Sequence, residues 1–443
     1  MAVLSLPDHI LHLIDRLEAA GFPTYAVGGC VRDMLLGRKP QDYDLCTAAL
    51  PEQTETLFSD RSLVLAGKKH GTVGVVTAAG VVEITTFRTE GGYGDNRHPD
   101  WVRFVPDIRE DLSRRDFTVN AMAWSPSRGF ADPFGGQADL KSKILRAVGD
   151  PATRFREDSL RILRGVRFAV RYHLQPENAT LQAMTGLASL MDNLARERVF
   201  DELCKLLPLV SAADVIRFAP ILAAVIPQLS PMIGFDQHSP HHAYDLITHT
   251  AHVVENVPGD LSLRWAALLH DTGKVPTFTR DENGRGHFYG HAGESAAYAD
   301  RILRDLKAPT ALREEVVLLI DLHMTKLVPE KKVLRRWLSR HGSGFIGKLL
   351  QFQQADMCSK GVDVSEELPQ FNQLREILRQ IEEENACLSL KDLAVKGNDL
   401  VALGITGPAI GKALNAMLEL VIDEQLPNEK PALLAWLTKQ PEL

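Results

Sequence analysis

The chain has 443 residues, of which 45% are hydrophobic and 24% are charged, and its net charge at pH 7 is −7. This composition indicates a globular protein of about three domains, and it excludes a wholly basic nucleic-acid binder while leaving a local basic face open. Five scattered cysteines without a CxxC pair predict reduced thiols in the cytoplasm. Neither a signal peptide nor an apolar run of membrane-spanning length is expected.

The first motif combines two glycines with two carboxylates. Residues 25–27 form a predicted strand that ends at Gly28 and Gly29, and a short helix is expected to follow. Adjacent glycines let backbone N–H groups turn toward an anion, and a helix start adds partial positive charge. Asp42 and Asp44 come next, two apart on a predicted strand, so both carboxylates can hold one divalent ion. Phosphoryl or nucleotidyl transfer requires such a combination.

The remainder of the first 140 residues continues this α/β pattern. Residues 73–76 and 81–87 are predicted strands, with Gly80 in a hairpin turn between them. Glu83 fits either a third acidic group near the metal or a solvated strand residue. Residues 88–100 are polar and glycine-rich, which indicates either a functional lid or a plain hairpin connection.

Arginines then gather in two places. Arg114 and Arg115 suit triphosphate oxygens, because guanidinium is a permanent forked donor, although such a run also fits a solvated face. A helix is predicted around 154–171, and on it Asp158 and Arg161 are three apart and should be neighbours. This spacing fits a surface ion pair. It also fits base selection, because cytosine and adenine each present an amino donor beside a ring-nitrogen acceptor, and guanine and uracil present the reverse.

Helical periodicity dominates from about residue 141, and strand signals become rare. We therefore expect an α+β, multi-domain chain with a small α/β head and a long all-α remainder. Composition breaks divide it into four predicted domains: 1–140, 141–235, 236–360 and 361–443.

Several motifs in order resemble class II tRNA nucleotidyltransferases, the CCA-adding enzymes, whose close relatives are bacterial poly(A) polymerases. The motifs that carry the resemblance are Gly28-Gly29 with Arg32-Asp33, Asp42-Tyr43-Asp44, Arg114-Arg115-Asp116 with Asn120, Asp132-Pro133-Phe134-Gly135-Gly136, and Glu157-Asp158 with Arg161. Residues 198–203 look like the family's helical neck, and 397–437 look like its tail. The resemblance implies a polymerase-beta-like nucleotidyltransferase head (1–140), a neck (141–235), a body and a tRNA-binding tail (361–443).

The resemblance also implies roles for matching residues. Asp42 and Asp44 would be catalytic and hold Mg²⁺, and the loop at 88–100 would allow a switch from C to A. The implied nucleotide contacts are Gly28, Gly29 and Arg32 for the triphosphate, Arg115, Asp116 and Asn120 for phosphates and sugar, and Asp158 and Arg161, with Arg164 nearby, for the base.

A second constellation lies in residues 241–356. A His-Asp dipeptide at the end of an apolar run, with outlying His and Asp, resembles the HD phosphohydrolase domain, here placed at 236–360. Nitrogen and oxygen ligands of this kind suit a transition metal such as Ni, Mn, Co or Fe. The matching residues are His249, His270, Asp271, His291, His323 and Asp356. A helical scaffold without metal remains the alternative.

These observations predict a cytoplasmic enzyme that adds C, C and A to tRNA 3′ ends from CTP and ATP and releases pyrophosphate. An additional phosphohydrolase activity would make it bifunctional. The alternatives are a poly(A) polymerase or A-adding enzyme, a metal phosphohydrolase with an RNA-binding head, and a non-catalytic tRNA chaperone. No membrane association is expected, and no protein partner is predicted.

Overall fold

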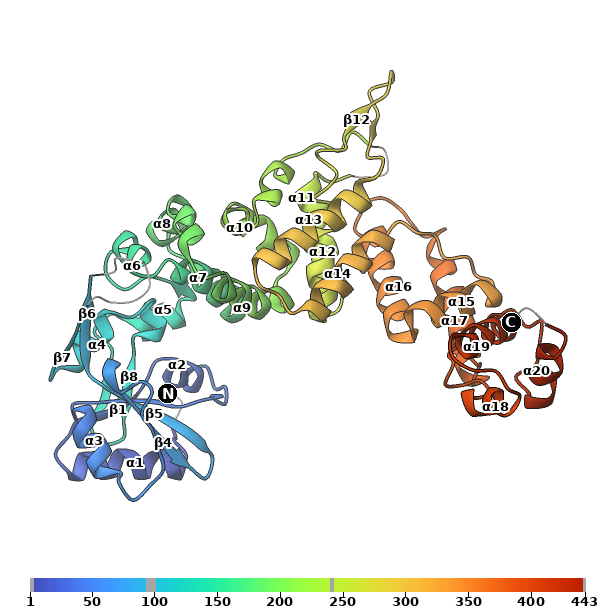
Figure 1. The fold of residues 1–443 in the computed structure, drawn as a ribbon. Coiled ribbons are helices and arrows are strands. Elements are labelled where there is room, and N and C mark those ends of the chain that lie inside the picture. The colour runs from blue at the N-terminus through green and yellow to red at the C-terminus, as the bar shows by residue number, and fades with distance from the viewer. Residues whose placement is uncertain (1–3, 93–100, 240–242, 441–443) are drawn as a thin grey trace. The chain divides into compact units, whose positions relative to one another are not determined.

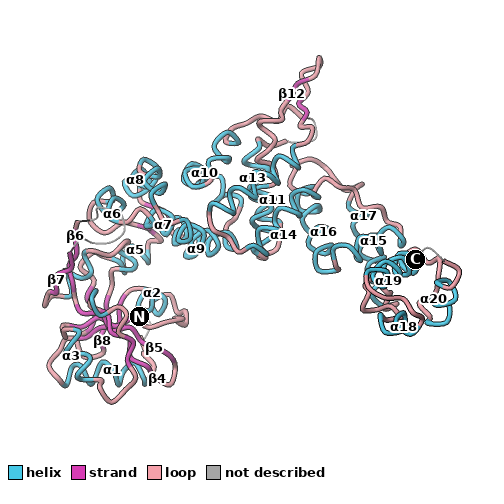
Figure 2. The backbone as a smooth tube through the Cα atoms, viewed as in Figure 1, coloured by secondary structure: helices cyan, strands magenta, loops and turns pink. Residues whose placement is uncertain are grey.

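The computed structural model describes residues 4–92, 101–239 and 243–440. The chain forms two compact units, one of Met1–Ser230 with Asp305–Ala308 and one of Pro231–Arg304 with Pro309–Leu443. Strands gather in the N-terminal head and helices form most of the remainder, so the predicted α+β fold is confirmed (Figures 1 and 2). The finer division into four domains stays a prediction.

A seven-stranded sheet is the centre of the head, with strand order β3-β4-β5-β2-β1-β8-β9. Only β2 and β5 run parallel, and the other neighbours are antiparallel. The predicted hairpin is confirmed, because β4 pairs with β5 and Gly80 has a φ of +123° at its turn. The strands are β1 (Thr24–Val27), β2 (Asp44–Thr47), β3 (Leu63–Val64), β4 (Thr72–Thr77), β5 (Gly80–Thr86), β8 (Ala123–Ser125) and β9 (Gly129–Ala131).

Helices cover the sheet where its strands present buried side chains. Helix α1 contacts β1, and α3 contacts β4 and β5. A second apolar cluster that includes Val27, Phe87 and Leu112 packs on the opposite face. The helices of the first unit are α1 (Asp8–Ala19), α2 (Gly29–Leu35), α3 (Pro51–Leu57), α4 (Ile108–Ser113), α5 (Gly136–Lys141), α6 (Pro151–Glu157), α7 (Leu160–Tyr172), α8 (Asn178–Gly186), α9 (Arg196–Leu206) and α10 (Ala212–Val225).

Two further strand pairs belong to this unit. Strands β6 (Arg88–Gly91) and β7 (Trp101–Phe104) form a hairpin, and β10 (Ile144–Leu145) pairs with β11 (Gln175–Pro176). The hairpin holds both ends of the predicted functional loop at 88–100, of which residues 93–100 lie outside the described residues. The structure therefore shows the base of that loop only.

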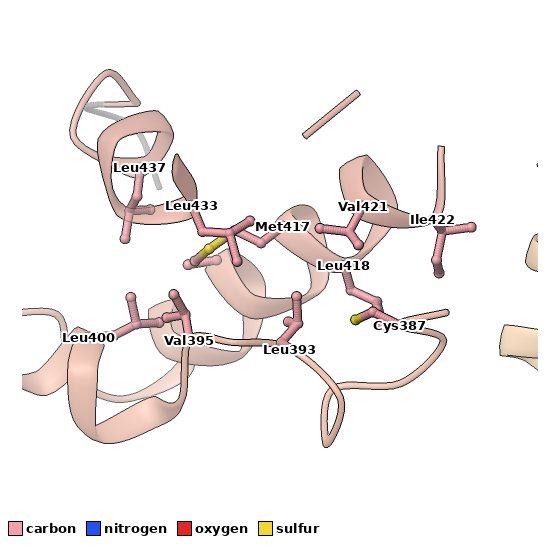
Figure 3. Packing of buried hydrophobic residues seen from close by; sticks show 11 residues of the cluster. Cys387, Leu393, Val395, Leu400, Met417, Leu418, Val421, Ile422, Leu433 and Leu437 are labelled. Atoms are coloured by element: carbon pink, nitrogen blue, oxygen red, sulfur yellow. The ribbon is translucent and has the colours of Figure 1, made fainter. Parts of the chain in front are cut away.

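In the second unit, the residues that the structure describes form helices and loops and one short hairpin, β12 (Thr279–Arg280) with β13 (Gly286–His287). In its C-terminal part, α18, α19 and α20 enclose an apolar cluster around Leu400, Met417 and Leu433 (Figure 3). Across the described ranges, no helix is both long and apolar enough to cross a membrane. The helices are α11 (Leu246–Asn256), α12 (Leu261–Leu269), α13 (His291–Asp305), α14 (Thr310–Leu322), α15 (Lys331–His341), α16 (Ser343–Cys358), α17 (Leu368–Glu383), α18 (Gly397–Ala402), α19 (Pro408–Ile422) and α20 (Lys430–Leu437).

Candidate active site

One polar cavity of about 480 Å³ in the first unit brings together every nucleotide and catalytic residue that the sequence indicated. Six arginines and four aspartates line it, so it can bind a polyanion beside a cation. Its lining residues are Gly28, Gly29, Arg32, Asp42, Asp44, Arg114, Arg115, Asp116, Asn120, Asp158, Leu160, Arg161, Arg164, Phe168 and Arg198.

The strand, glycine turn and helix form as predicted at residues 24–35. Gly28 has a φ of +75° and donates its N–H to the Met122 carbonyl at 2.9 Å. A Cβ atom at position 28 would lie 3.0 Å from Arg115 Nη1, so a larger residue would strain the backbone and displace that guanidinium. The Arg115 Nε atom is buried and has no hydrogen-bond partner among the described residues, which suits a bound anion.

The two carboxylates lie beside each other, although not as the strand pattern predicted. Strand β2 begins at Asp44, so Asp42 precedes it, because the chain bends before the strand pairing starts. Both still line the cavity. The register of β2 and β5, extended by one residue from Leu45 and Ile84, places Asp44 next to Glu83, and both side chains are exposed. Partial desolvation and the negative charges of Asp42 and Glu83 together raise the pKa of Asp44 to about 6, against the opposing effect of Arg115.

Such mutual repulsion between carboxylates is relieved by a bound cation, so the donor set fits a hard divalent ion. Glu83 is an exposed strand residue beside this pair, so both alternatives for it stay open. Phe87, the last residue of the strand predicted at 81–87, lies beyond the end of β5 and is buried.

Arg32 is held in place from several directions. Its guanidinium hydrogen-bonds Asp33 at 3.0 and 2.9 Å, Asn120 Oδ1 and the Tyr172 hydroxyl, and it lies 4.1 Å from the centre of the Tyr172 ring. Asn120 in turn donates to Asp116 Oδ1 at 3.0 Å. An arginine has five N–H donors, and these contacts use four of them, so Arg32 presents a fixed positive charge with little free donor capacity.

Asp116 joins this network to helix α7. Arg164 donates to Asp116 Oδ2 from Nε at 2.9 Å and from Nη2 at 2.7 Å. Burial opposes ionisation of Asp116, but Arg164, the Asn120 hydrogen bond and Arg161 outweigh it and lower its pKa to about 2. A continuous chain of hydrogen bonds thus connects Arg32 on α2, through Asn120 and Asp116, with Arg164 on α7.

The expected contact between Asp158 and Arg161 is wrong. The predicted helix is interrupted, because α6 ends at Glu157 and Asp158 is extended with φ −142° and ψ 102°. Arg161 instead donates to Glu157 Oε2 at 2.7 Å, across the break, at the last residue of α6. Asp158 binds Arg198 Nη2 at 3.1 Å. Both residues line the same cavity, separately oriented by these two partners.

Sequence reasoning missed Arg198 and Phe168, which line the cavity, and Tyr172, which contacts Arg32. Arg198 was noted only as part of the neck motif, and its side chain reaches the cavity from α9. Tyr172 and Phe168, which pack on Arg32 and Arg164, were not noted at all. Their position one helical turn apart on α7, next to Arg164, Arg167 and Arg171, was the available signal.

A second cluster of titratable residues is buried in the second unit. His249 Nε2 lies 3.0 Å from Asp356 Oδ1, and His270 Nε2 lies 3.1 Å from Asp271 Oδ2. His291 Nε2 lies 3.6 Å from Asp271 Oδ1, and the rings of His291 and His323 are 5.3 Å apart. The residues predicted for the HD constellation are therefore brought together. Two subsets can each enclose an ion: His249, His270 and Asp271, and Asp271, His291 and His323.

All four imidazoles in this cluster are oriented in the same way. Each Nδ1 faces a backbone carbonyl: that of Ser359 at 3.1 Å for His249, and those of Ala267, Phe288 and Ile320 for His270, His291 and His323. A proton on Nδ1 leaves Nε2 as the acceptor, which is the arrangement of metal-ligating histidines. The Nε2 atoms of His270 and His291 are buried without a hydrogen bond in the described part of the chain. This donor set fits a transition metal ion.

Three protein-family patterns match the chain. A poly A polymerase head domain matches residues 24–146, a probable RNA and SrmB binding site of polymerase A matches 173–217, and a putative second domain of tRNA nucleotidyltransferases matches 287–437.

Curated relatives match over nearly the whole length. The CCA-adding enzyme of Streptococcus mutans is 32% identical over 97% of this chain and 96% of its own. That of Levilactobacillus brevis is 33% identical over 96% of each. The crystal structure of the Bacillus stearothermophilus CCA-adding enzyme in complex with CTP is 28% identical, covers 97% of this chain and 96% of that one, and has a TM-score of 0.71. The predicted resemblance is confirmed, and the chain belongs to the family of CCA-adding enzymes.

Proposed function

We propose that this chain adds C, C and A in sequence to the 3′ end of tRNA, with CTP and ATP as donors and no nucleic-acid template. The observation that carries the proposal is the single cavity that gathers paired carboxylates, six arginines and both candidate base-reading residues. The full-length similarity to CCA-adding enzymes supports the same activity.

The arginine-rich side of the cavity binds the triphosphate. Arg115 offers a buried Nε donor, and Arg32 contributes a positive charge fixed by its own partners. Gly28 keeps the cavity open beside Arg115, because a Cβ atom there would crowd the guanidinium. Positive charge held in place before substrate arrives costs no reorganisation during the reaction.

Asp42, Asp44 and Glu83 hold Mg²⁺ in this proposal, since carboxylate oxygens are its preferred protein ligands. Enzymes of this kind use a divalent metal, which lowers the pKa of the attacking hydroxyl and neutralises the leaving pyrophosphate. The acceptor 3′-hydroxyl loses its proton to solvent water, its oxygen bonds to the α-phosphorus, and the bond from that phosphorus to the pyrophosphate oxygen breaks, so pyrophosphate leaves with the electron pair. The carboxylates orient the reactants through the ion, and their negative charges offset its positive charge.

Asp158 and Arg161, which also line the cavity, select the base of the incoming nucleotide. The Asp158 carboxylate accepts a hydrogen bond from an exocyclic amino group, and the Arg161 guanidinium donates one to the adjacent ring nitrogen. Arg198 and Glu157 fix the two orientations separately, which replaces the direct contact that the sequence suggested. Cytosine and adenine meet both requirements, whereas guanine and uracil present two mismatched groups.

The test is extension of a tRNA that ends at its discriminator base. With CTP alone the product should gain two nucleotides, and with CTP and ATP it should gain three. Extension by ATP alone, without any incorporation of CTP, would instead support the A-adding or poly(A) polymerase alternative.

A second function is proposed for the histidine cluster: hydrolysis of a phosphate ester, such as a 2′,3′-cyclic or terminal phosphate, by an HD domain at 236–360 loaded with Ni, Mn, Co or Fe. The shared Nδ1 orientation of its four histidines favours this. A divalent ion there would polarise the ester and activate water. If wild type and a His270→Ala, Asp271→Ala variant released phosphate equally, the second function would be refuted.

The remaining assignments follow from this reading. The four predicted parts correspond to head (1–140), neck (141–235), HD domain (236–360) and tRNA-binding tail (361–443). We place the enzyme in the cytoplasm, where its five free cysteines stay reduced.

A further inference from the structure

Three exposed valines form a continuous apolar strip on the head sheet. Val64, Val76 and Val81 are 45%, 37% and 54% exposed. Val76 pairs with Val81, and Val64 pairs with Gly74, so all of these positions share one face of the sheet. A Cβ atom at Gly74 would lie 2.9 Å from Val81 Cγ1 and 3.0 Å from Val64 Cβ. The missing side chain at Gly74 therefore lets the valines meet, and we call the three of them the valine shelf.

The valine shelf lies beside the catalytic carboxylates. Gly74 pairs with Glu83, and Glu83 neighbours Asp44 across the parallel pair β2–β5. Strand geometry puts the Cα atoms of Val81 and Glu83 roughly 7 Å apart, and Val64, three strands from Asp44, roughly 14 Å from it. The shelf and the carboxylates thus occupy consecutive positions on one surface.

The nucleotide cavity extends in the other direction from Asp44. It is lined from the β1–α2 turn, the segment 114–120, and helices α7 and α9, and no described residue of β3, β4 or β5 lines it. In phosphoryl transfer the attacking and leaving oxygens are roughly in line, on opposite sides of the phosphorus. Since the arginines that receive the pyrophosphate lie on the cavity side, the attacking hydroxyl comes from the side of β5, β4 and β3.

We infer that the valine shelf receives the 3′-terminal nucleotides of the RNA acceptor, which pack their bases and sugars on its methyl groups. This inference rests on the proposed nucleotidyl transfer. Single-stranded RNA ends have unstacked bases whose faces can cover apolar side chains. Methyl groups offer no hydrogen bonds, so the shelf is indifferent to base identity. That property is required of a site whose acceptor ends first in the discriminator base, then in C, then in CC.

The test uses an acceptor-stem hairpin RNA, because contacts to the rest of a whole tRNA would mask a weak local effect. A Val64→Ser, Val81→Ser double variant should raise the KM for the hairpin about tenfold, on the scale expected for two partly buried aliphatic side chains. The KM for CTP and the kcat at saturating hairpin should stay within twofold. The matched control is Phe130→Ser on β9, which is 36% exposed at the opposite edge of the same sheet and should change neither KM.

A charged variant and a crosslink make the result independent of small folding effects. Val64→Asp should raise the KM for the hairpin at least as much, because it adds repulsion toward phosphate. A 4-thiouridine at the 3′ end of the hairpin should crosslink to wild-type peptides within residues 63–81. An unchanged KM in both variants, or crosslinks confined to α7, would overturn the inference. The inference would also be overturned if the valine variants changed the self-association of the protein and left the KM for the hairpin unchanged. Failure of the wild type to extend the hairpin or tRNA would refute the proposed function instead.

Discussion

The ion pair between Asp116 and Arg164 gives a quantitative prediction. Asp116→Asn keeps the shape of the side chain and, with its amide oxygen toward Asn120, that hydrogen bond. It replaces the negatively charged oxygen that two Arg164 nitrogens contact at 2.9 and 2.7 Å with a neutral NH2 group, which cannot accept from them. The Asp116 side chain is buried, so solvent screens this interaction little. The variant should therefore weaken the first unit without changing its packing.

The size of the effect follows from the pKa of Asp116, which falls from its ordinary value of 3.8 to about 2. A shift of this size corresponds to about 2 kcal/mol of folding free energy at neutral pH. Because the pKa is lowered in the folded state, the contribution is complete above the unfolded pKa near 4. It is lost as the pH falls toward 2, and roughly half should remain at pH 3.

Hydrogen exchange measured peptide by peptide suits a chain with two compact units, since it reports local stability. At pH 7, slowly exchanging amides of residues 117–122 and 160–172 should exchange about thirtyfold faster in Asp116→Asn than in wild type. The difference should shrink at pH 3. Asp60→Asn, which breaks an exposed pair with Arg16, is the control and should change little. Equal exchange in Asp116→Asn and wild type, or a difference that grows with acid, would refute the reasoning.

Three other substitutions test separate parts of the account. Arg198→Met frees the Asp158 carboxylate, so UTP and GTP misincorporation should rise about tenfold relative to CTP in single-turnover assays, and unchanged selectivity would contradict its orienting role. Tyr172→Phe removes one hydrogen bond to Arg32 and should raise the KM for CTP several-fold with little change in kcat; a selective loss of kcat would argue against this. His270→Ala should lower the amount of transition metal bound per chain, measured by mass spectrometry, while CTP incorporation stays at the wild-type rate. An unchanged metal content would refute the proposed metal site of the HD domain.

The sequence predicted those parts of the active site that depend on local structure. Gly28 and Asp44 sit at the end of one strand and the start of the next, so turn chemistry and strand pattern were sufficient to bring them together. The predicted contact between Asp158 and Arg161 was wrong because it depended on a helix that does not continue. Helical spacing applies only while the helix continues, and it breaks at Asp158, where an arginine forty residues later in the chain takes over as partner.

In the histidine cluster, too, the residue types could be predicted from the sequence and their orientation could not. Its ligand set followed from residue types in order, because His and Asp are recognisable as donors wherever they occur. The carbonyls that orient each Nδ1 could not be predicted, since any residue supplies a carbonyl and only the backbone path decides which one faces the ring. The valine shelf likewise depends on strand register across β3, β4 and β5, which periodicity alone does not fix.

The central claim is that one cavity supplies metal, triphosphate and base recognition for addition of CCA. It is tested most directly by sequencing the 3′ ends of tRNA after incubation with all four nucleoside triphosphates. The account predicts ends that stop at CCA in wild type, and unextended ends in an Asp42→Ala, Asp44→Ala variant. Three results would contradict it: runs of A at the 3′ end, incorporation of G or U at the same rate as C and A, or extension by the variant to the same CCA end as wild type.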